Sequence, residues 1–430
     1  MSVPISDSAS QELSDSETRE RSALETQRFS ASAPQSLRVS EPAFITIVMP
    51  VRNEERFIAD TLQQLLGQDY PADRFEIIVA DGMSDDATRK IVMNIASQHP
   101  QVRLLDNPRQ RSSAGRNIGF KNGKGDIFLV VDGHCFIPDN QLLKNTAACL
   151  EKSGADCLGR PQPLDPPGLT EFQKAVALAR ASKLGHGGDS LIFGEYEGFA
   201  SPVSNGAAYK KEVFEKAGYL DEAFDACEDV EFNYRVEQAG YTCYTSPKLT
   251  IRYYPRENLR GLFRQMTRYG SGRRRFTRKH PKALTLNQLI PAGFVVGILS
   301  LGVTAALSLA GVEFLSLGIV EVLSSGVAKV LSHGGAEALS SAGTTSLRPF
   351  VPSPLILLIA PLLLLYALYL IIIIAESVRI AAKNGWQYLR WVPFIIITIH
   401  FGLGWGFVRQ ILSDLAPLKL RALVITCLRN

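Results

Sequence analysis

The 430-residue sequence has few cysteines, and none of the six lies in a CxxC pair or in the dense framework that stabilises small secreted domains. Its first forty residues contain no apolar run of the kind that a secretory signal peptide needs. We therefore expect reduced thiols, no cleaved leader, and a globular part that stays in the cytoplasm.

The sequence also lacks the usual glycine-rich phosphate loops. No GxGxxG follows its first strand-like segment, and no GxxxxGK[ST] occurs anywhere, which argues against dinucleotide oxidoreductases and P-loop proteins. The formal net charge is only +4, and the basic residues gather just before the apolar C-terminal region. Nucleic acid is therefore not an expected partner.

Composition divides the chain into three regions. Residues 1–40 are rich in Ser, Glu and Gln and offer too little apolar surface to offset the entropy of ordering, so we predict a disordered tail. Residues 41–285 mix charged and apolar runs as a soluble α/β domain does. Residues 286–430 are dominated by Leu, Ile, Val, Ala and Gly, which predicts a membrane region.

Three apolar runs in the last region have the length that a membrane-spanning helix needs, about 17 to 25 residues. They cover residues 289–312, 355–375 and 391–408. Between the first two, apolar residues recur at helical spacing over 315–331, a pattern that fits an interfacial helix, a fourth span or a loop.

Basic residues suggest how these runs are oriented. A dense basic segment, 252–282, precedes the first run, and three basic residues lie between the second and third, Arg379, Lys383 and Arg390. The positive-inside rule places both segments, and the globular domain, in the cytoplasm. Three full crossings would leave a basic C-terminus outside, so either a fourth crossing exists or the HFGLGWGF segment dips in without spanning.

The globular region alternates strand and helix patterns. We predict a strand at 44–49 that stops at Pro50, a helix at 54–68, a strand at 75–80 and a helix at 87–97. This alternation implies a parallel sheet, whose ligands bind beyond the carboxyl ends of the strands. The polar segments Pro50–Glu55 and Asp81–Asp86 lie at those ends, although Asp81 can equally be a helix N-terminal acid.

A third predicted strand, 127–131, ends in Asp132-Gly133-His134. The carboxylate and the imidazole can both face one divalent ion, and two protein ligands suit a Mg²⁺ or Mn²⁺ that is shared with substrate phosphates. Upstream, Arg111 and Arg116 precede a predicted helix and can approach a phosphate, although lone arginines are usually solvated.

Two acids, Glu228 and Asp229, fall at the N-terminus of a predicted helix. Acids there often serve only as partners of the helix dipole. One of them can instead act as a general base if it reaches an acceptor hydroxyl. Glu231 is the nearest substitute for that role.

Arginines recur at every fourth position over 256–268, which aligns them on one helical face with Gln265 and Tyr269 beside them. One interpretation is a stripe attracted to anionic membrane lipids. The other is that Gln265 and Arg268 close over a diphosphate.

In this order the segments resemble glycosyltransferase family 2, and especially its branch that assembles bacterial exopolysaccharides such as succinoglycan. The resemblance covers residues 44–275. Its motifs are Val48–Glu55, Gln68–Pro71 with Phe75–Ser84, Gly115–Gly119, Asp132–His134, Glu228–Asp229 with Asn233–Arg235, and Arg264–Gln265 with Tyr269–Gly270.

The resemblance implies a GT-A fold, a nucleotide diphosphate-sugar donor such as a UDP-sugar, and a divalent metal held by Asp132 and His134. It implies inverting transfer, with Asp229 as the base and Glu228 adjacent. The donor-binding residues that it implies are Pro50, Arg52, Glu54, Asp81, Arg116, Asp132, Gln265 and Arg268.

Two departures from the family pattern affect this expectation. His134 replaces the usual second Asp of the DxD motif, which keeps a ligand but lowers its charge. The QxxRW signature of processive synthases appears only as QMTRY, from Gln265 to Tyr269. We therefore expect transfer of one sugar to a glycan or lipid-linked acceptor, with a processive synthase or an idle scaffold as the alternatives.

Overall fold

The computed structural model describes residues 41–186, 191–309 and 354–415. The predicted tail at 1–40 and the helical pattern at 315–331 lie outside the described residues. The five cysteines within them are free and buried, as expected for reduced thiols.

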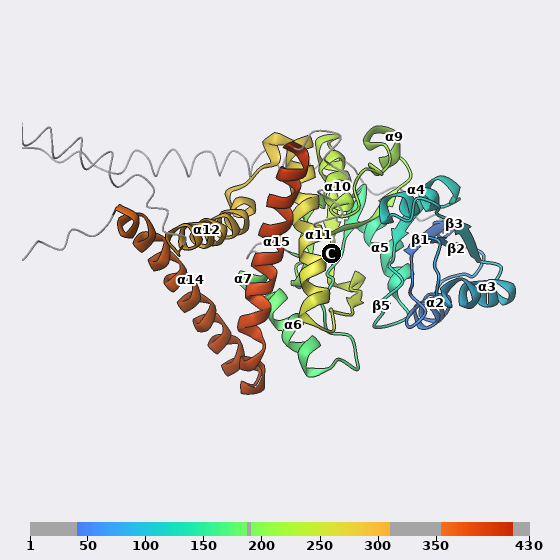
Figure 1. The fold of residues 1–430 in the computed structure, drawn as a ribbon. Helices are drawn as coiled ribbons and strands as arrows, with labels where there is room; N and C mark the ends of the chain where they lie inside the picture. Colours follow the sequence, from blue (N-terminus) through green and yellow to red (C-terminus); the bar gives the residue numbers. More distant parts are fainter. Residues whose placement is uncertain (1–40, 187–190, 310–353, 416–430) are drawn as a thin grey trace, which may run out of the picture. The chain divides into compact units, whose positions relative to one another are not determined.

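The globular domain is built on an eight-stranded sheet with the order β3-β2-β1-β4-β8-β6-β9-β7. Its strands β1, β2 and β3 lie at the end of the domain away from the apolar helices (Figure 1). Strands β1 to β4 run parallel, while β8 is antiparallel to both β4 and β6, and β7 is antiparallel to β9. The strands are β1 Ile45–Val51, β2 Phe75–Asp81, β3 Val102–Asp106, β4 Ile127–Val130, β6 Cys157–Gly159, β7 Gly198–Phe199, β8 Gly206–Lys210 and β9 Cys243–Thr245. The predicted, mostly parallel α/β sheet is confirmed.

The first strand runs two residues further than predicted. Pro50 does not stop β1, because Pro50 and Val51 pair with Ala80 and Asp81 of β2. Pairing with β4 ends at Val48, so at Pro50 one side of the strand has no neighbour that needs a backbone N–H.

Helices cover the faces of this sheet. Three residues of α2, Ile58, Leu62 and Leu65, are fully buried in the core that includes β1 and β2, and each contributes roughly 1.5 to 3 kcal/mol of transfer free energy. The helices of the domain are α2 Ile58–Leu66, α3 Thr88–Gln98, α4 Ser112–Asn122, α5 Leu142–Ser153, α6 Glu171–Ala181, α7 Lys183–His186, α8 Pro202–Asn205, α9 Val213–Ala217 and α10 Glu228–Gln238.

Helix α4 starts earlier than expected, at Ser112, so Arg116 lies within the helix rather than before it. Glycines allow this helix to approach β1 closely. A Cβ atom at Gly119 would lie 2.3 Å from Val48 Cγ1, and one at Gly115 would lie 3.0 Å from Pro50 Cβ. The first turn of α4 is thereby held beside the carboxyl end of β1.

Two short strands, four long helices and four short 3-10 helices, Leu191–Phe193, Pro247–Leu249, Pro281–Ala283 and Trp386–Arg390, complete the described chain. β5 (Cys135–Phe136) pairs with β10 (Arg252–Tyr253). The helices are α11 Leu259–Lys279, α12 Leu286–Leu309, α14 Pro354–Asn384 and α15 Val392–Leu415. The last three are long and apolar enough to cross a membrane, as the three predicted runs require.

Helix α15 differs from the other two apolar helices in its surroundings. Within its apolar segment, 44% of the chain is buried inside the protein, compared with 11% for the apolar segments of α12 and α14. It lies alongside α11 (Figure 1), and glycines bring the two backbones together. A Cβ at Gly406 would lie 2.0 Å from the Thr267 carbonyl oxygen, and one at Gly270 would lie equally close to that of Leu403.

Polar contacts extend this packing to the end of α15. Ser271 Oγ donates to the Gly406 carbonyl at 2.9 Å, and Arg278 pairs with Asp414 at 2.6 Å. The most basic of the described helices is therefore joined to the most buried of the three apolar helices.

Candidate active site

A cavity of about 2140 Å³ opens at the carboxyl ends of β1 and β4 and continues past α10 and α11 towards the apolar helices. It exceeds the roughly 300 to 1,000 Å³ of a typical small-molecule pocket. The sequence-predicted site residues that line it are Pro50, Arg52, Glu54, Arg116, Asp132, His134, Glu228, Asp229, Gln265 and Arg268.

Asp81 is the predicted site residue that does not line the cavity. Its carboxylate is fully buried beneath the loop that follows β2, where it accepts hydrogen bonds from Ser84 Oγ at 2.5 Å and from Arg89 Nη1 at 2.7 Å. The next residue, Gly82, does reach the cavity wall. A contact between Asp81 and a donor therefore stays a prediction.

Asp132 and His134 follow β4 at its carboxyl end. The Nδ1 atom of His134 lies 2.8 Å from Glu54 Oε1. Burial alone would lower the pKa of His134, but this hydrogen bond and the charges of Glu54 and Asp132 outweigh burial and raise it. Metal-bound imidazoles commonly share their second nitrogen with a carboxylate in this way.

No group of three metal-ligating side chains occurs among the described residues. Asp132 and His134 alone would hold an ion, and substrate phosphates and water would supply its other ligands. This carboxylate-and-imidazole pair, with Glu54 orienting the ring, fits Mg²⁺ or Mn²⁺.

Arg116 links the two acidic parts of the site. Its Nη2 atom lies 3.8 Å from Asp132 Oδ1 and 3.8 Å from Glu228 Oε1. Burial alone would lower the pKa of Arg116, yet the charges of Glu228, Asp132 and Asp229 raise it above the usual value. The guanidinium is therefore a fixed positive charge beside the position expected for a metal and a diphosphate.

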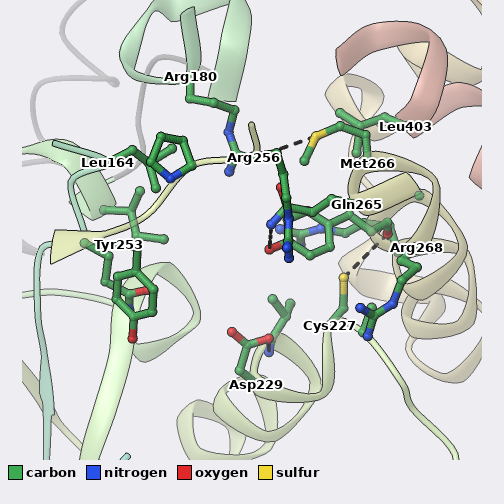
Figure 2. Close-up of a pocket in the computed structure, with 18 of the residues that line it drawn as sticks. Leu164, Arg180, Cys227, Asp229, Tyr253, Arg256, Gln265, Met266, Arg268 and Leu403 are labelled. Carbon is green, nitrogen blue, oxygen red and sulfur yellow. Dashed lines mark hydrogen bonds between the residues drawn. The ribbon is translucent and has the colours of Figure 1, made fainter. Parts of the chain in front are cut away.

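The neighbouring acids of α10 lie in different surroundings. Glu228 is 6% exposed, and its pKa is raised by burial and by Asp229, against the opposing effect of Arg116. Asp229 is exposed and points into the open part of the cavity (Figure 2). Of the two, Asp229 has the clearer access to an acceptor.

Glu231 is not placed to substitute for Asp229. It is fully buried, and it pairs with Arg235 at 2.9 Å, Lys279 at 2.9 Å and His280 at 3.0 Å. Burial alone would raise its pKa, but these hydrogen bonds lower it. Glu231 therefore joins α10 to the end of α11.

The arginine stripe divides into two sets. Helix α11 begins at Leu259, so Arg256 precedes it in a loop. Each step of four residues also turns an α-helix by about 40°, which rotates the face along the helix. Gln265, Arg268 and Arg256 line the cavity, whereas Arg260 and Arg264 lie on the exposed surface.

Two arginines of the cavity carry no signal in the sequence. Arg160 follows β6 and is 2% exposed; it donates to the Tyr253 hydroxyl at 3.0 Å, while its Nε and Nη1 find no partner among the described residues. Arg180 of α6 is 8% exposed and reaches the cavity from the side opposite Asp229 (Figure 2). Their positions depend on packing between distant segments, which no local motif encodes.

Comparison with known proteins gives this geometry a context. The family described as "Glycosyltransferase like family 2" matches residues 42–272, more than half of the chain. The succinoglycan biosynthesis protein ExoA of Rhizobium meliloti is 34% identical over 263 residues, which cover 61% of this chain and 78% of that protein.

A second relative, from Methanococcus voltae, is a dolichyl N-acetyl-α-D-glucosaminyl phosphate 3-β-D-2,3-diacetamido-2,3-dideoxy-β-D-glucuronosyltransferase. It is 27% identical over 271 residues, covering 61% of this chain and 83% of that enzyme. Among solved structures, the mannosyltransferase PcManGT of Pyrobaculum calidifontis, in complex with GDP-Man and Mn²⁺, aligns with a TM-score of 0.48 at 18% identity, over 90% of this chain and 92% of its own. By its family match, the chain belongs to glycosyltransferase-like family 2 and has the GT-A fold.

Proposed function

We propose that this glycosyltransferase moves one sugar from a UDP-sugar to a lipid-linked or polysaccharide acceptor, with inversion at the anomeric carbon, during assembly of a surface glycan. One observation carries the proposal. A single cavity brings the Asp132–His134 pair, the Arg116 guanidinium and the exposed Asp229 together at the carboxyl ends of the strands.

In the proposed reaction Asp229 accepts the proton of the acceptor hydroxyl as that oxygen attacks the anomeric carbon. The sugar–phosphate bond breaks as the new glycosidic bond forms, and the electron pair leaves with the diphosphate. Arg116 stabilises the charge that develops there, because it is already oriented by Asp132 and Glu228. A divalent ion at Asp132 and His134 would supply Lewis acidity to the same leaving group.

The name of the Methanococcus voltae relative supports a lipid-linked acceptor, since that enzyme acts on a dolichyl phosphate-linked sugar. The size of the cavity also supports two substrates, because its volume is at least twice that of an ordinary single-ligand pocket.

We further propose that the protein is a multi-pass protein of the cell (inner) membrane in which α12 and α14 cross the bilayer and α15 lies along its cytoplasmic surface. Helix α15 packs along α11, and α11 carries eight Arg and Lys residues between Leu259 and Lys279. Such charges are costly in the hydrocarbon layer. The basic segments at both ends of α11 and near Lys383 favour a catalytic domain on the cytoplasmic side.

This topology predicts which introduced cysteines a membrane-impermeant thiol reagent will label. In a background with Cys427 replaced by serine, Glu151→Cys, Lys383→Cys and Leu415→Cys are all expected to react only from the cytoplasmic side, and all three positions are exposed. Lys383 and Leu415 flank α15, so labelling from opposite sides would show that α15 crosses. Labelling of residue 151 from outside would overturn the cytoplasmic assignment.

The function itself is tested with the full-length protein in detergent and a panel of UDP-sugars, by measuring UDP release and product length with a membrane-lipid extract as acceptor. One UDP-sugar is expected to give metal-stimulated UDP release and a product longer by one sugar. Long polymers would favour a processive synthase, and no turnover with any donor would favour an idle scaffold.

A further inference from the structure

The active-site cavity has an apolar end that the transfer reaction does not explain. Beyond α11 its wall is formed by α12, α14 and α15, through Phe294, Tyr366, Tyr369 and Leu403 among others. The Tyr366 hydroxyl donates to the Phe294 carbonyl at 2.6 Å, and the rings of Phe294 and Tyr369 lie 4.4 Å apart. The cavity thus runs without a break from the catalytic acids to helices with membrane-spanning character.

Two arginines lie where the polar part of the cavity meets the apolar part. Arg180 extends from α6, beside an apolar cluster formed with α11 and α15, and Arg256 extends from the loop before α11. Both side chains point towards the open space above Asp229 (Figure 2). Burial raises the pKa of Tyr269, while the charges of Arg180 and Arg256 lower it and that of Asp229 raises it, so all three act on one neighbour.

Along the cavity, an acid is followed by two cations and then by an apolar wall. This order matches the order of groups in a lipid-linked acceptor. The attacking hydroxyl belongs near Asp229, a phosphate suits the two guanidinium groups, and a hydrocarbon chain suits the compartment between α12 and α14. A polysaccharide acceptor would leave both the cations and the apolar wall without a use.

We propose that Arg180 and Arg256 bind the phosphate of a sugar-carrying long-chain lipid phosphate, whose sugar supplies the attacking hydroxyl and whose hydrocarbon chain enters from the bilayer between α12 and α14. This inference rests on the proposed function and narrows its acceptor to the lipid-linked class. Arg180 is a positioning residue in this scheme, since it sets where the phosphate lies and hence which hydroxyl reaches Asp229.

Phosphate binding by the two arginines is tested by measuring how farnesyl phosphate binds to the full-length protein in detergent, with UDP present. Farnesyl phosphate is expected to bind at least about tenfold more tightly than farnesol, because a charge-assisted pair adds an order of magnitude or more in affinity. Arg180→Gln should reduce that preference several-fold, because it removes one of the two guanidinium groups. The matched control is Arg260→Gln, on the exposed surface of α11 and outside the cavity, which should retain it.

Binding of the hydrocarbon chain in the apolar compartment is tested by substitutions at two glycines of α12. A Cβ atom at Gly293 or at Gly302 would meet no atom within 4 Å, but only Gly293 lines the cavity. Gly293→Phe is therefore expected to weaken farnesyl phosphate binding about tenfold by filling the compartment, and Gly302→Phe to leave it unchanged. UDP should bind all four variants with unchanged affinity.

Equal binding of farnesyl phosphate and farnesol would overturn the proposal, as would equal loss in Gly293→Phe and Gly302→Phe. Competition by inorganic phosphate or by phosphatidylglycerol at the same concentration as farnesyl phosphate would point to a free anion or to bulk lipid, and would overturn it too. If UDP-sugar turnover persists in those cases, the proposed function stands and only the lipid acceptor is lost.

Discussion

Asp229→Asn is expected to lower kcat by about 10²- to 10⁴-fold while the affinity for the UDP-sugar changes less than about twofold, because general-base catalysis typically contributes that much and the side chain keeps its shape. Asp229 is exposed in the cavity, and no donor-binding role is assigned to it. Single-turnover rates with saturating donor, together with calorimetric titration of UDP, would measure the two quantities separately.

Glu228→Gln is the matched control for this substitution. Glu228 is 6% exposed and faces Arg116, so its loss should disturb the leaving-group side and lower kcat less than Asp229→Asn does. If Asp229→Asn instead weakened donor binding and preserved kcat, Asp229 would be a positioning group. Glu231 could not take its place, because its carboxylate is buried among Arg235, Lys279 and His280.

Asp132→Ala should abolish transfer at every concentration of Mg²⁺ or Mn²⁺, since a metal contributes several kcal/mol of transition-state stabilisation and this change leaves His134 as the single protein ligand. A loss of more than about 10³-fold follows from a contribution of that size. Removal of the carboxylate also leaves Arg116 without one of its partners at 3.8 Å.

Direct Mn²⁺ binding, followed by electron paramagnetic resonance with and without UDP, gives a readout that does not depend on turnover. We expect wild-type protein to bind Mn²⁺ much more tightly with UDP present and Asp132→Ala to lose this effect. Asp73→Ala, at an exposed position away from the cavity, is the control for loss of one carboxylate. Full transfer by Asp132→Ala, or in excess EDTA, would exclude a metal from the reaction.

The sequence was most informative where strands end. Buried apolar runs predict β1, β2 and β4, and because parallel strands end at one edge of a sheet, the residues that follow β1 and β4 were expected together. The cavity does bring Arg52, Glu54 and Asp132 into one wall. The contact between Glu54 and His134 joins residues 80 positions apart and has no counterpart in either motif alone.

Sequence patterns were least informative where helices meet. The sequence around Arg180 does not distinguish it from a solvated surface arginine. Its position in the cavity depends on the packing of the apolar face of α6 against α11 and α15. The apolar run at 391–408 satisfies the length for a membrane span, but hydropathy cannot distinguish burial against lipid from burial against protein. Within HFGLGWGF, Gly402 and Gly406 permit close contact with α11, and Gly404 permits close contact with Pro291 of α12, so this part of the apolar run is buried against protein.

The glycine contacts at Gly270 and Gly406 also fix the separation between α11 and α15. If α15 rests on the membrane surface, its contacts oppose tilting of α11. Because Glu231 joins α10 to the end of α11, Asp229 of α10 would then stay at one height above the bilayer. Only the hydroxyls of a sugar near its lipid anchor then come within reach. Each added sugar moves the growing end of the glycan further from the bilayer. Addition would then stop after one sugar, because the new terminal hydroxyl would lie beyond the fixed height of Asp229.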